Sequence, residues 1–427
     1  MEFSKICVLG MGYIGLPTAS TLASHGYKVV GVDIDRHVID SLRNGEIHIQ
    51  EPGLKTLVHA AFRSGNLEVF EKPQEADVFI IAVPTPIMED KSADMRYVIS
   101  ATESIVPFLR KGNLVMLEST SPPRTTVDLV APILEKSGLR PGLDFYLTYS
   151  PERVMPGKIL QELIENARVV GGINQVSAEA GRDLYAAFVR GEILLTDATT
   201  AEMVKLMENT FRDVNIAIAN EFARLAERFG VNVWDAIHLA NLHPRIDILR
   251  AGPGVGGHCV SVDPWFFVEK APDLSLLIKQ ARQVNDGQPL FTTESIARTL
   301  GGLEGKRVAA LGLTYKANVD DMRESPALEV AKYLVKNGAE VFTYEPFVPN
   351  ASAPDCKAKS TLAEVLAEAD AVVLLVDHRQ FEELDPGWVA ERMPGRIAFD
   401  TRGVWDRKAW EEAGFQLGIL GVGQVNG

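Results

Sequence analysis

The chain has 427 residues, of which 46% are hydrophobic and 23% charged, and its formal net charge is −14. This length suffices for two or three domains, the composition excludes wholesale disorder, and the negative charge argues against nonspecific binding to nucleic acid. The N-terminal segment lacks a long apolar core followed by a cleavage site, no apolar run is long enough to cross a bilayer, and three cysteines make no disulfide framework. We therefore expect a cytoplasmic protein without a nucleic-acid or membrane partner.

Residues 5–33 predict a strand, a tight turn, a helix and a second strand. The apolar run KICVLG is followed by small, helix-compatible residues that stop at Gly26, a typical residue just after a helix. A second apolar run, YKVVGVD, ends in Asp33. This order predicts a βαβ unit with parallel strands. The later runs ADVFIIAVPT and GNLVMLEST enter Pro/Ser/Thr loops, where a ligand is expected at the strand ends.

The turn of this unit carries the motif Gly10-x-Gly12-x-x-Gly15. In a dinucleotide-binding loop the first glycine permits the turn, the second lets the backbone approach a pyrophosphate, and the third lets helix and strand pack closely. Asp33 at the end of the next strand can bind ribose hydroxyls and would repel a 2′-phosphate. NAD is therefore expected rather than NADP, although the nearby Arg36 weakens this preference. The alternative is that the glycines serve only a turn.

The middle of the chain is helical in pattern. The sequence changes in character at Ala198, and residues 199–230 have apolar spacing for one long helix without internal Gly or Pro; residues 232–241 and 274–286 predict two more helices. Lys205 and Asn209 are four residues apart on the long helix and would project from one face. Taken alone, a lysine on such a helix is more often simply solvated.

The segment GPGVGGHCVSVDPW carries the densest chemical signal. Glycines crowd in before Cys259, and Asp263 follows four residues later, so a helix beginning near the cysteine would place both side chains on one face. Closely spaced glycines suit approach of the backbone to a ligand. We predict that Cys259 is a nucleophile whose thiolate is stabilised below its ordinary pKa of about 8.5. The alternative is a small buried hydrophobe, the reading we give to Cys7; Cys356 lies in an irregular segment.

Two further residues fall at predicted strand ends. Glu152 follows the strand-like run DFYLTYS, and Thr120 follows GNLVMLES, so both face the ligand edge of the first sheet. A carboxylate there is well placed for acid–base work. The histidines show no spacing typical of a metal site, and no metal is expected.

The last third repeats the opening pattern. KRVAALGLTYK echoes KICVLGMGY, and three further strand ends follow in the same order as in the first domain. We therefore predict an α/β protein with two Rossmann-like doubly wound domains, 1–197 and 301–427, joined by a helical central domain, 198–300, that carries the long helix. In the second copy the segment Gly312-Leu-Thr314-Tyr-Lys316 has bulkier residues in place of the later glycines, so a second dinucleotide is not expected in the same position. Lys316 and Arg323 instead place cations where a nucleotide diphosphate would lie.

Together these motifs resemble the UDP-glucose/GDP-mannose dehydrogenase family of nucleotide-sugar 6-dehydrogenases, over essentially the whole chain. The signature Gly-x-Gly-Gly-x-Cys-x-x-x-Asp, here Gly254 to Asp263, is specific when combined with an upstream Lys-x-x-x-Asn helix. The resemblance implies an NAD-dependent enzyme that oxidises the C6 hydroxyl of a UDP-sugar twice. It also implies a homodimer through the central helix.

The resemblance also implies residue roles. Cys259 would be the nucleophile, Lys205 and Asn209 would stabilise the oxyanion, and Asp263 would activate and orient water or hydroxyl. Glu152 and Thr120 would serve thioester hydrolysis. The implied cofactor-binding residues are Gly10, Gly12, Tyr13, Ile14, Gly15, Asp33, Thr85, Thr120 and Arg323. The implied substrate-binding residues are Glu152, Arg153, Lys205, Asn209, Arg245, Gly256, Lys316 and Arg402, with Arg245 acting from the neighbouring subunit.

The sequence leaves alternatives open both for the sugar of the substrate and for the class of function. UDP-glucose enzymes usually have a second Glu four residues after the one matching Glu152, and Pro156 stands there instead. The segments GEIHIQEPGL and PERVMPG favour UDP-N-acetyl-D-mannosamine, with UDP-N-acetylglucosamine as the nearest alternative. A single-step hydroxyacid dehydrogenase needs neither the cysteine nor a third domain. A non-catalytic NAD sensor would not need Cys259, Lys205 and Asp263.

Overall fold

The computed structural model describes residues 3–49 and 51–423; residue 50, within GEIHIQEPGL, lies outside them. The chain divides into two compact units. The first comprises Met1–Glu208 and Trp265–Pro272, and the second comprises Asn209–Pro264 and Asp273–Gly427. Among the described residues, no helix is both long enough and apolar enough to cross a membrane.

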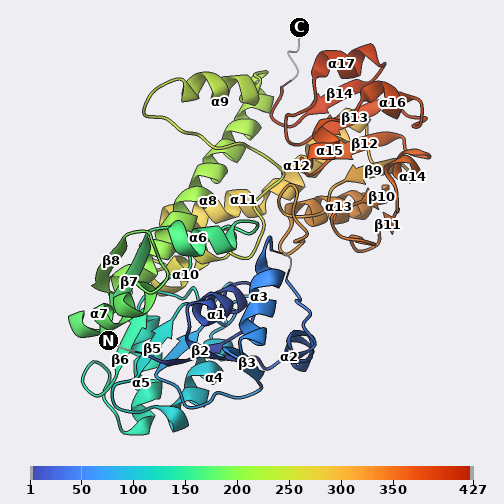
Figure 1. The fold of residues 1–427 in the computed structure, drawn as a ribbon. Coiled ribbons are helices and arrows are strands. Elements are labelled where there is room, and N and C mark those ends of the chain that lie inside the picture. The colour runs from blue at the N-terminus through green and yellow to red at the C-terminus, as the bar shows by residue number, and fades with distance from the viewer. Residues whose placement is uncertain (1–2, 50, 424–427) are drawn as a thin grey trace. The chain divides into compact units, whose positions relative to one another are not determined.

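The first unit is built on an eight-stranded sheet in the order β3-β2-β1-β4-β5-β6-β7-β8 (Figure 1). All neighbouring strands are parallel except β6 and β7. The strands are β1 (Lys5–Leu9), β2 (Lys28–Val32), β3 (Leu67–Phe70), β4 (Val78–Ile81), β5 (Leu114–Leu117), β6 (Tyr146–Tyr149), β7 (Arg168–Gly172) and β8 (Ile193–Asp197). The α-helices are α1 (Gly15–Ser24), α2 (Arg36–Arg43), α3 (Leu54–Arg63), α4 (Arg96–Ile105), α5 (Ala131–Leu134), α6 (Ile159–Glu165) and α7 (Gln175–Tyr185), and the short turns of 3-10 or π type are Val106–Phe108, Thr126–Val130 and Glu135–Ser137.

The second unit contains a six-stranded sheet in the order β11-β10-β9-β12-β13-β14, with all neighbours parallel. Its strands are β9 (Arg307–Leu311), β10 (Glu340–Tyr344), β11 (Lys357–Ala358), β12 (Ala371–Leu374), β13 (Ile397–Asp400) and β14 (Gln416–Ile419). The remaining helices are α8 (Ala198–Phe229), which spans both units, α9 (Val233–Asn241), α10 (Asp263–Lys270), α11 (Leu276–Asp286), α12 (Gln288–Leu300), α13 (Pro326–Lys336), α14 (Leu362–Leu366), α15 (Arg379–Glu382), α16 (Pro386–Ala390) and α17 (Arg407–Glu412).

The predicted repeat is confirmed by these two strand orders. The first six strands of each sheet follow the same 3-2-1-4-5-6 arrangement, the order of doubly wound dinucleotide folds. The side chains of β1 are buried on both faces of the sheet. Ile6 and Val8 belong to the hydrophobic core on one face, and Cys7 and Leu9 belong to the core on the other. The continuous apolar run of a predicted strand therefore reflects burial on both faces.

The long central helix is confirmed as α8, which has 32 residues (Figure 1). Gly26 has φ +95°, as expected for the glycine that ends α1. One expectation needs correction: the helix after the cysteine begins at Asp263, not at Cys259. Pro264 lies in the first turn of this helix, where proline is favoured because the N–H that it lacks would have no acceptor within the helix.

Candidate active site

The glycine loop lies between β1 and α1. Gly10 has φ +92°, and a Cβ there would overlap the carbonyl of Ala82. A Cβ at Gly15 would overlap the carbonyl of Gly10, so this glycine is needed for helix and strand to pack. At Gly12 a Cβ would meet no atom within 4 Å, so protein packing does not demand this glycine. The open backbone at Gly12 fits a pyrophosphate at the start of α1, with half-buried Tyr13 and Ile14 beside it.

Asp33 is tied to the same loop. Its Oδ2 accepts a hydrogen bond from Met11 N at 2.9 Å, and its Oδ1 accepts one from Asp35 N at 2.9 Å. Arg36, the cation that weakened the preference for NAD, pairs with Glu71 at 3.0 Å. These contacts hold the Asp33 carboxylate at the end of β2, where it fits the ribose hydroxyls of NAD.

Two predicted threonines meet beyond β4 and β5. Thr85 Oγ1 donates to the carbonyl of Thr120 at 2.6 Å. The structure thus brings the loops after these two strands together at the carboxyl edge of the sheet, the edge that also carries Gly10 and Asp33.

Glu152 lies just beyond β6 and is 8% exposed. Its Oε1 accepts from Arg153 N at 2.7 Å, and its Oε2 accepts from Arg168 Nη2 at 3.0 Å. The guanidinium of Arg153 instead pairs with Glu208, at 2.6 Å between Nη2 and Oε1.

Three buried residues behind Glu152 were missed by sequence reasoning: Glu118, Arg168 and Tyr185. Arg168 opens the apolar segment RVVGG, and Glu118 ends the segment LVMLE, so each is a charged residue at the edge of a buried strand. Burial raises the pKa of Glu118 to about 7, and the Glu152 carboxylate adds to the rise, while Arg168 and Tyr185 lower it. Charged groups at the ends of otherwise apolar strands were the available signal.

Cys259 lies half-buried in the turn that leads into α10. Its carbonyl accepts from Val262 N at 3.0 Å and from Asp263 N at 2.8 Å, so cysteine and aspartate are joined by one turn of backbone although the helix starts later. Asp263 is 2% exposed, and its Oδ2 accepts from Asn209 Nδ2 at 2.6 Å. Two of the predicted catalytic residues are therefore in direct contact, and a third is linked to them through the backbone.

The glycines before Cys259 have a packing role that the sequence did not indicate. A Cβ at Gly256 would lie 2.5 Å from the carbonyl oxygen of Glu324, and one at Gly257 would lie 2.9 Å from the ring of Tyr315. Gly257 N also donates to the carbonyl of Arg323 at 3.1 Å. The close approach is thus to the chain's own segment 315–324, which ties the cysteine turn to the loop that follows β9.

That loop carries Lys316 and Arg323. The Arg323 guanidinium donates to Asp321 at 2.9 Å and 2.6 Å, and His258 Nδ1 lies 3.9 Å from Asp321 Oδ2. Burial alone would raise the pKa of Asp321, but hydrogen bonds from Arg323 and the charges of Arg323 and His258 outweigh it and lower that pKa. A carboxylate here is therefore kept charged beside the cysteine turn.

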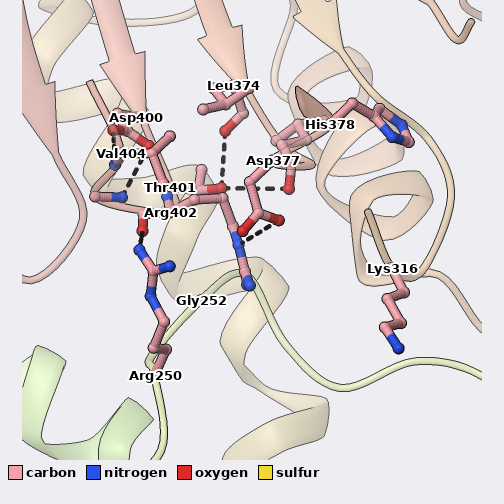
Figure 2. A network of polar contacts seen from close by, with 12 residues as sticks. Arg250, Gly252, Lys316, Leu374, Asp377, His378, Asp400, Thr401, Arg402 and Val404 are labelled. Atoms are coloured by element: carbon pink, nitrogen blue, oxygen red, sulfur yellow. Dashed lines mark hydrogen bonds and ion pairs between the residues drawn. The ribbon is translucent and has the colours of Figure 1, made fainter. Parts of the chain in front are cut away.

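Arg402 follows β13 and is fixed by several contacts (Figure 2). Its Nε donates to Asp377 Oδ1 at 3.1 Å, and its carbonyl accepts from Arg250 Nη2 at 2.8 Å. The Asp400 carboxylate accepts from four successive backbone amides, those of residues 402–405. Gly252 leaves space for the guanidinium, because a Cβ there would overlap Arg402 Nη1.

In the second domain, the backbone amides of the loop that corresponds to the glycine loop donate hydrogen bonds to a carboxylate of the protein itself. Glu345, at the end of β10 as Asp33 is at the end of β2, accepts from Leu313 N at 2.7 Å and from Thr314 N at 3.1 Å. His378 Nδ1 accepts from Asn318 N at 2.9 Å, so its Nε2 carries the proton that faces Glu345 at 3.1 Å. The amide of Thr314, at the position of Gly12, thus already has an acceptor.

The other predicted residues fall as follows. Lys205 and Asn209 are half-buried on α8 with the predicted spacing, and Arg245 is exposed in the loop after α9. The first unit holds Gly10, Gly12, Tyr13, Ile14, Gly15, Asp33, Thr85, Thr120, Glu152, Arg153 and Lys205. The second unit holds Asn209, Arg245, Gly256, Cys259, Asp263, Lys316, Arg323 and Arg402. Within the described ranges, no cluster of three or more His, Cys, Asp or Glu side chains is arranged to hold a metal ion.

Residues 4–189 match the NAD binding domain of the UDP-glucose/GDP-mannose dehydrogenase family, residues 199–287 its central domain and residues 309–407 its UDP binding domain. The chain belongs to this family. The family resemblance and the expectation of NAD as cofactor are confirmed, and the match at residues 309–407 supports a UDP-linked ligand.

Several relatives in this family are similar over nearly their full length. A UDP-N-acetyl-D-mannosamine dehydrogenase from Methanococcus maripaludis is 48% identical, covering 99% of this chain and 98% of the relative. An NDP-N-acetyl-D-galactosaminuronic acid dehydrogenase from Ralstonia nicotianae is 46% identical, covering 96% and 98%. The solved structure of a UDP-D-ManNAc dehydrogenase from Pyrococcus horikoshii is 42% identical, with a TM-score of 0.92 and coverage of 99% and 100%.

Proposed function

We propose that this protein is an NAD-dependent dehydrogenase that oxidises the C6 hydroxyl of UDP-N-acetyl-D-mannosamine to a carboxylate. The observation that carries the proposal is the Asn209–Asp263 contact, joined through one backbone turn to Cys259, within a chain of this family. In domain terms, residues 1–197 bind NAD, residues 198–300 carry the nucleophile, and residues 301–427 bind the nucleotide.

The glycine loop, Asp33, Thr85 and Thr120 hold NAD in this proposal, and the bound cofactor supplies a hydride acceptor. The first oxidation yields a C6 aldehyde, to which the Cys259 thiolate adds as a thiohemiacetal. The second oxidation yields a thioester, and water then releases the carboxylate and the thiol. For each alcohol, two hydrides leave, one water is consumed and three protons are released, so each acid formed accompanies two NADH.

Charge develops on the C6 oxygen when the thiolate adds and again when water attacks. Lys205, assisted by Asn209, stabilises this oxyanion, an effect worth about 3 kcal/mol in comparable sites. Asp263, held by Asn209, orients the hydroxyl or water. Glu152 and Thr120 serve hydrolysis of the thioester.

Nucleotide binding is assigned to cations of the second unit. Arg402, fixed by Asp377 and by its carbonyl bond to Arg250, presents a guanidinium suited to phosphate or uracil oxygens. Lys316 provides a second cation after β9, and Arg323 is assigned to the cofactor phosphates. Arg153 and Gly256 complete the substrate set.

A homodimer is proposed from the surface of α8. Five large apolar side chains recur at spacings of seven, four, three and four residues, which places them on one face of the helix. They are exposed by 41% to 72%: Phe211, Ile218, Phe222, Leu225 and Phe229. A contiguous apolar face of this kind marks a protein interface. The exposed Arg245 is assigned to the substrate of the partner subunit.

The choice of sugar rests on two observations. Pro156 replaces the second glutamate expected of UDP-glucose enzymes, and several relatives at 46–48% identity are named for UDP-N-acetyl-D-mannosamine. A relative at 46% identity is named for a different amino sugar, so overall identity does not separate these substrates. UDP-N-acetylglucosamine is the second candidate.

The test is to measure NADH production on a panel of UDP-sugars and to quantify the acid formed. We expect the highest kcat/KM with UDP-N-acetyl-D-mannosamine, little turnover of UDP-glucose, and about two NADH per acid. NADP at matched concentration should be a poor cofactor because the Asp33 carboxylate would repel a 2′-phosphate. One NADH per product would favour a single-step dehydrogenase, and no turnover would favour an NAD sensor. A higher kcat/KM with UDP-N-acetylglucosamine would change only the sugar.

A further inference from the structure

We propose that Arg168 is a positioning residue for Glu152, and that Glu118 and Tyr185 hold Arg168 in place for this purpose. The inference rests on the proposed function, since it concerns the role of Glu152 in thioester hydrolysis. All four residues lie in the first unit.

The topology of the sheet brings Arg168 to Glu152. The β6–β7 pair is the antiparallel one in this sheet, with Thr148 opposite Gly172 and Tyr149 opposite Gly171. Continuing this register by three residues places Glu152 opposite Arg168. A parallel β7 would have put its first residue at the other edge of the sheet, so the reversal delivers a cation to the carboxyl ends of β5 and β6.

Both oxygens of Glu152 are held. Oε2 accepts from Arg168 Nη2 at 3.0 Å, and Oε1 accepts from Arg153 N at 2.7 Å. The side chains of Arg168 and Glu152 are 6% and 8% exposed, so water screens the charges little. Two directed hydrogen bonds to separate oxygens fix the plane of the carboxylate as well as its place.

The guanidinium is supported on its far side. Its Cζ lies 4.2 Å from the centroid of the Tyr185 ring, and its Nη1 lies 3.9 Å from Glu118 Oε1. The Tyr185 hydroxyl donates to the same Glu118 oxygen. A cation stacked on an aromatic face and facing a second carboxylate has little freedom to turn away from Glu152.

The spare polar atoms of the cluster fit this arrangement. Among the described residues, neither Arg168 Nη1 nor Glu118 Oε2 has a hydrogen-bond partner, and both are buried. A group serving stability alone would be expected to satisfy its donors and acceptors. Arg168 instead makes its short hydrogen bond, at 3.0 Å, to Glu152, and its distance to Glu118 is longer, at 3.9 Å.

The experiment is a double-mutant cycle with Glu152→Gln, Arg168→Lys and the combination. We expect each single variant to lower kcat by about tenfold or more, within the range for acid–base residues, with the KM for the UDP-sugar within about twofold. If Arg168 acts through Glu152, the double variant should be no slower than Glu152→Gln within about twofold. Both single variants should also accumulate a sugar adduct on Cys259, detectable by intact-protein mass spectrometry.

Arg282→Lys is the matched control, because Arg282 is 2% exposed and its Nη1 pairs with Asp213 at 2.5 Å in the second unit. Its kcat should stay within about twofold of wild type, because Arg282 pairs with Asp213 and Asp286 and not with Glu152. Should Arg168→Lys fail to fold, Tyr185→Phe keeps the ring and removes the hydroxyl. That variant should lower kcat in the wild-type background and have no further effect in the Glu152→Gln background.

The outcomes separate the two ideas. If the kcat of the double variant fell by the product of the two single losses, the positioning role would be overturned while the dehydrogenase function stood. The absence of a sugar adduct in Arg168→Lys would have the same meaning. Wild-type kcat in Glu152→Gln would also overturn it, because nothing would then be positioned. A wild-type protein that reduces no NAD with any UDP-sugar would overturn the proposed function and this inference with it.

Discussion

Cys259 is half-buried in a turn whose backbone is bonded to the first residue of α10. Replacement by Ala should leave this turn intact, because the substitution keeps the carbonyl of residue 259, which accepts from Val262 N and Asp263 N. We expect Cys259→Ala to abolish acid formation while NAD binding at the Gly10 loop, in the other unit, is unchanged. Acid production can be followed by chromatography and NAD binding by calorimetry.

Cys259→Ser provides the companion variant. The hydroxyl is a far weaker nucleophile and leaving group than the thiolate, so any ester should hydrolyse slowly and a sugar–protein adduct should be trapped. Near-normal acid production by Cys259→Ala would show that the thiol only fills space.

Glu118 gives a pH-dependent prediction on stability. Burial raises its pKa in the folded protein from the ordinary 4.5 to about 7, with Glu152 adding to the rise. A raised carboxyl pKa contributes stability that is fully present below 4.5 and is lost as the pH rises through about 7. The total loss is about 3 kcal/mol, since one pKa unit is worth about 1.4 kcal/mol.

Glu118→Gln removes this titration. We expect its free energy of unfolding, measured by urea denaturation between pH 5 and 8, to fall less with rising pH than that of the wild type. Parallel pH profiles for the two proteins would contradict the assignment.

The residues that sequence alone could predict are those whose signal is local. Gly10, Asp33, Cys259 and Asp263 were proposed from local spacing, but the contact of Asp263 with Asn209 was not predicted, because it joins residues 54 positions apart in the sequence. Arg168 could not be found in this way. Its significance depends on the antiparallel pairing of β7 with β6, which apolar periodicity does not specify.

At the level of elements, α8 combines a buried face with an apolar exposed face. Ala219, Ala223 and Ala226 are buried, while Phe222 and Leu225 are exposed by 42% and 41%. A surface helix usually has polar residues on its exposed face, whereas α8 has large apolar residues there and small residues on its buried face. This pattern is expected when a partner covers the exposed face.

We expect the double substitution Phe222→Glu and Leu225→Glu to convert a dimer to a monomer in size-exclusion chromatography with light scattering. Paired carboxylates on each copy would repel and lose their hydration in the interface. Val176→Glu on α7 is the matched control, because Val176 is also exposed, by 49%, but lies on a different helix. An unchanged mass of the double variant would place the interface elsewhere.

The spacing of apolar residues predicts long helices but not contacts between segments that are far apart in the sequence. The spacing of apolar residues predicted α8, α9 and α11, because long helices repeat the signal over several turns. It did not predict that the glycines before Cys259 pack against residues 315–324, since that contact joins segments about sixty residues apart. The glycines were noticed for the right reason, close approach of backbone, but their neighbour is the chain itself.

At the scale of the whole molecule, the two sheet domains share their strand order and also a hydrogen bond between a carboxylate at a strand end and a backbone amide of the loop after the first strand. Asp33 and Glu345 stand at matching strand ends and accept from matching amides, Met11 N and Leu313 N. The two copies differ at the next position, where Gly12 is open and the Thr314 amide is taken by Glu345. One copy therefore keeps the features of a dinucleotide site, and the other offers Lys316 and Arg402 instead.

This division predicts separable ligand effects on stability. A ligand at about 100 times its Kd stabilises the folded state by about 2.7 kcal/mol, so NAD and UDP should each raise the melting temperature of the full chain. Asp33→Ala should remove the shift caused by NAD and keep the shift caused by UDP, because Asp33 lies in the first unit. Arg402→Met should do the reverse, because Arg402 lies in the second unit. Differential scanning calorimetry of each variant with each ligand measures all four shifts. Loss of both shifts in Arg402→Met, with an unchanged melting temperature in the absence of ligand, would show that the two ligands do not bind to separate units as proposed.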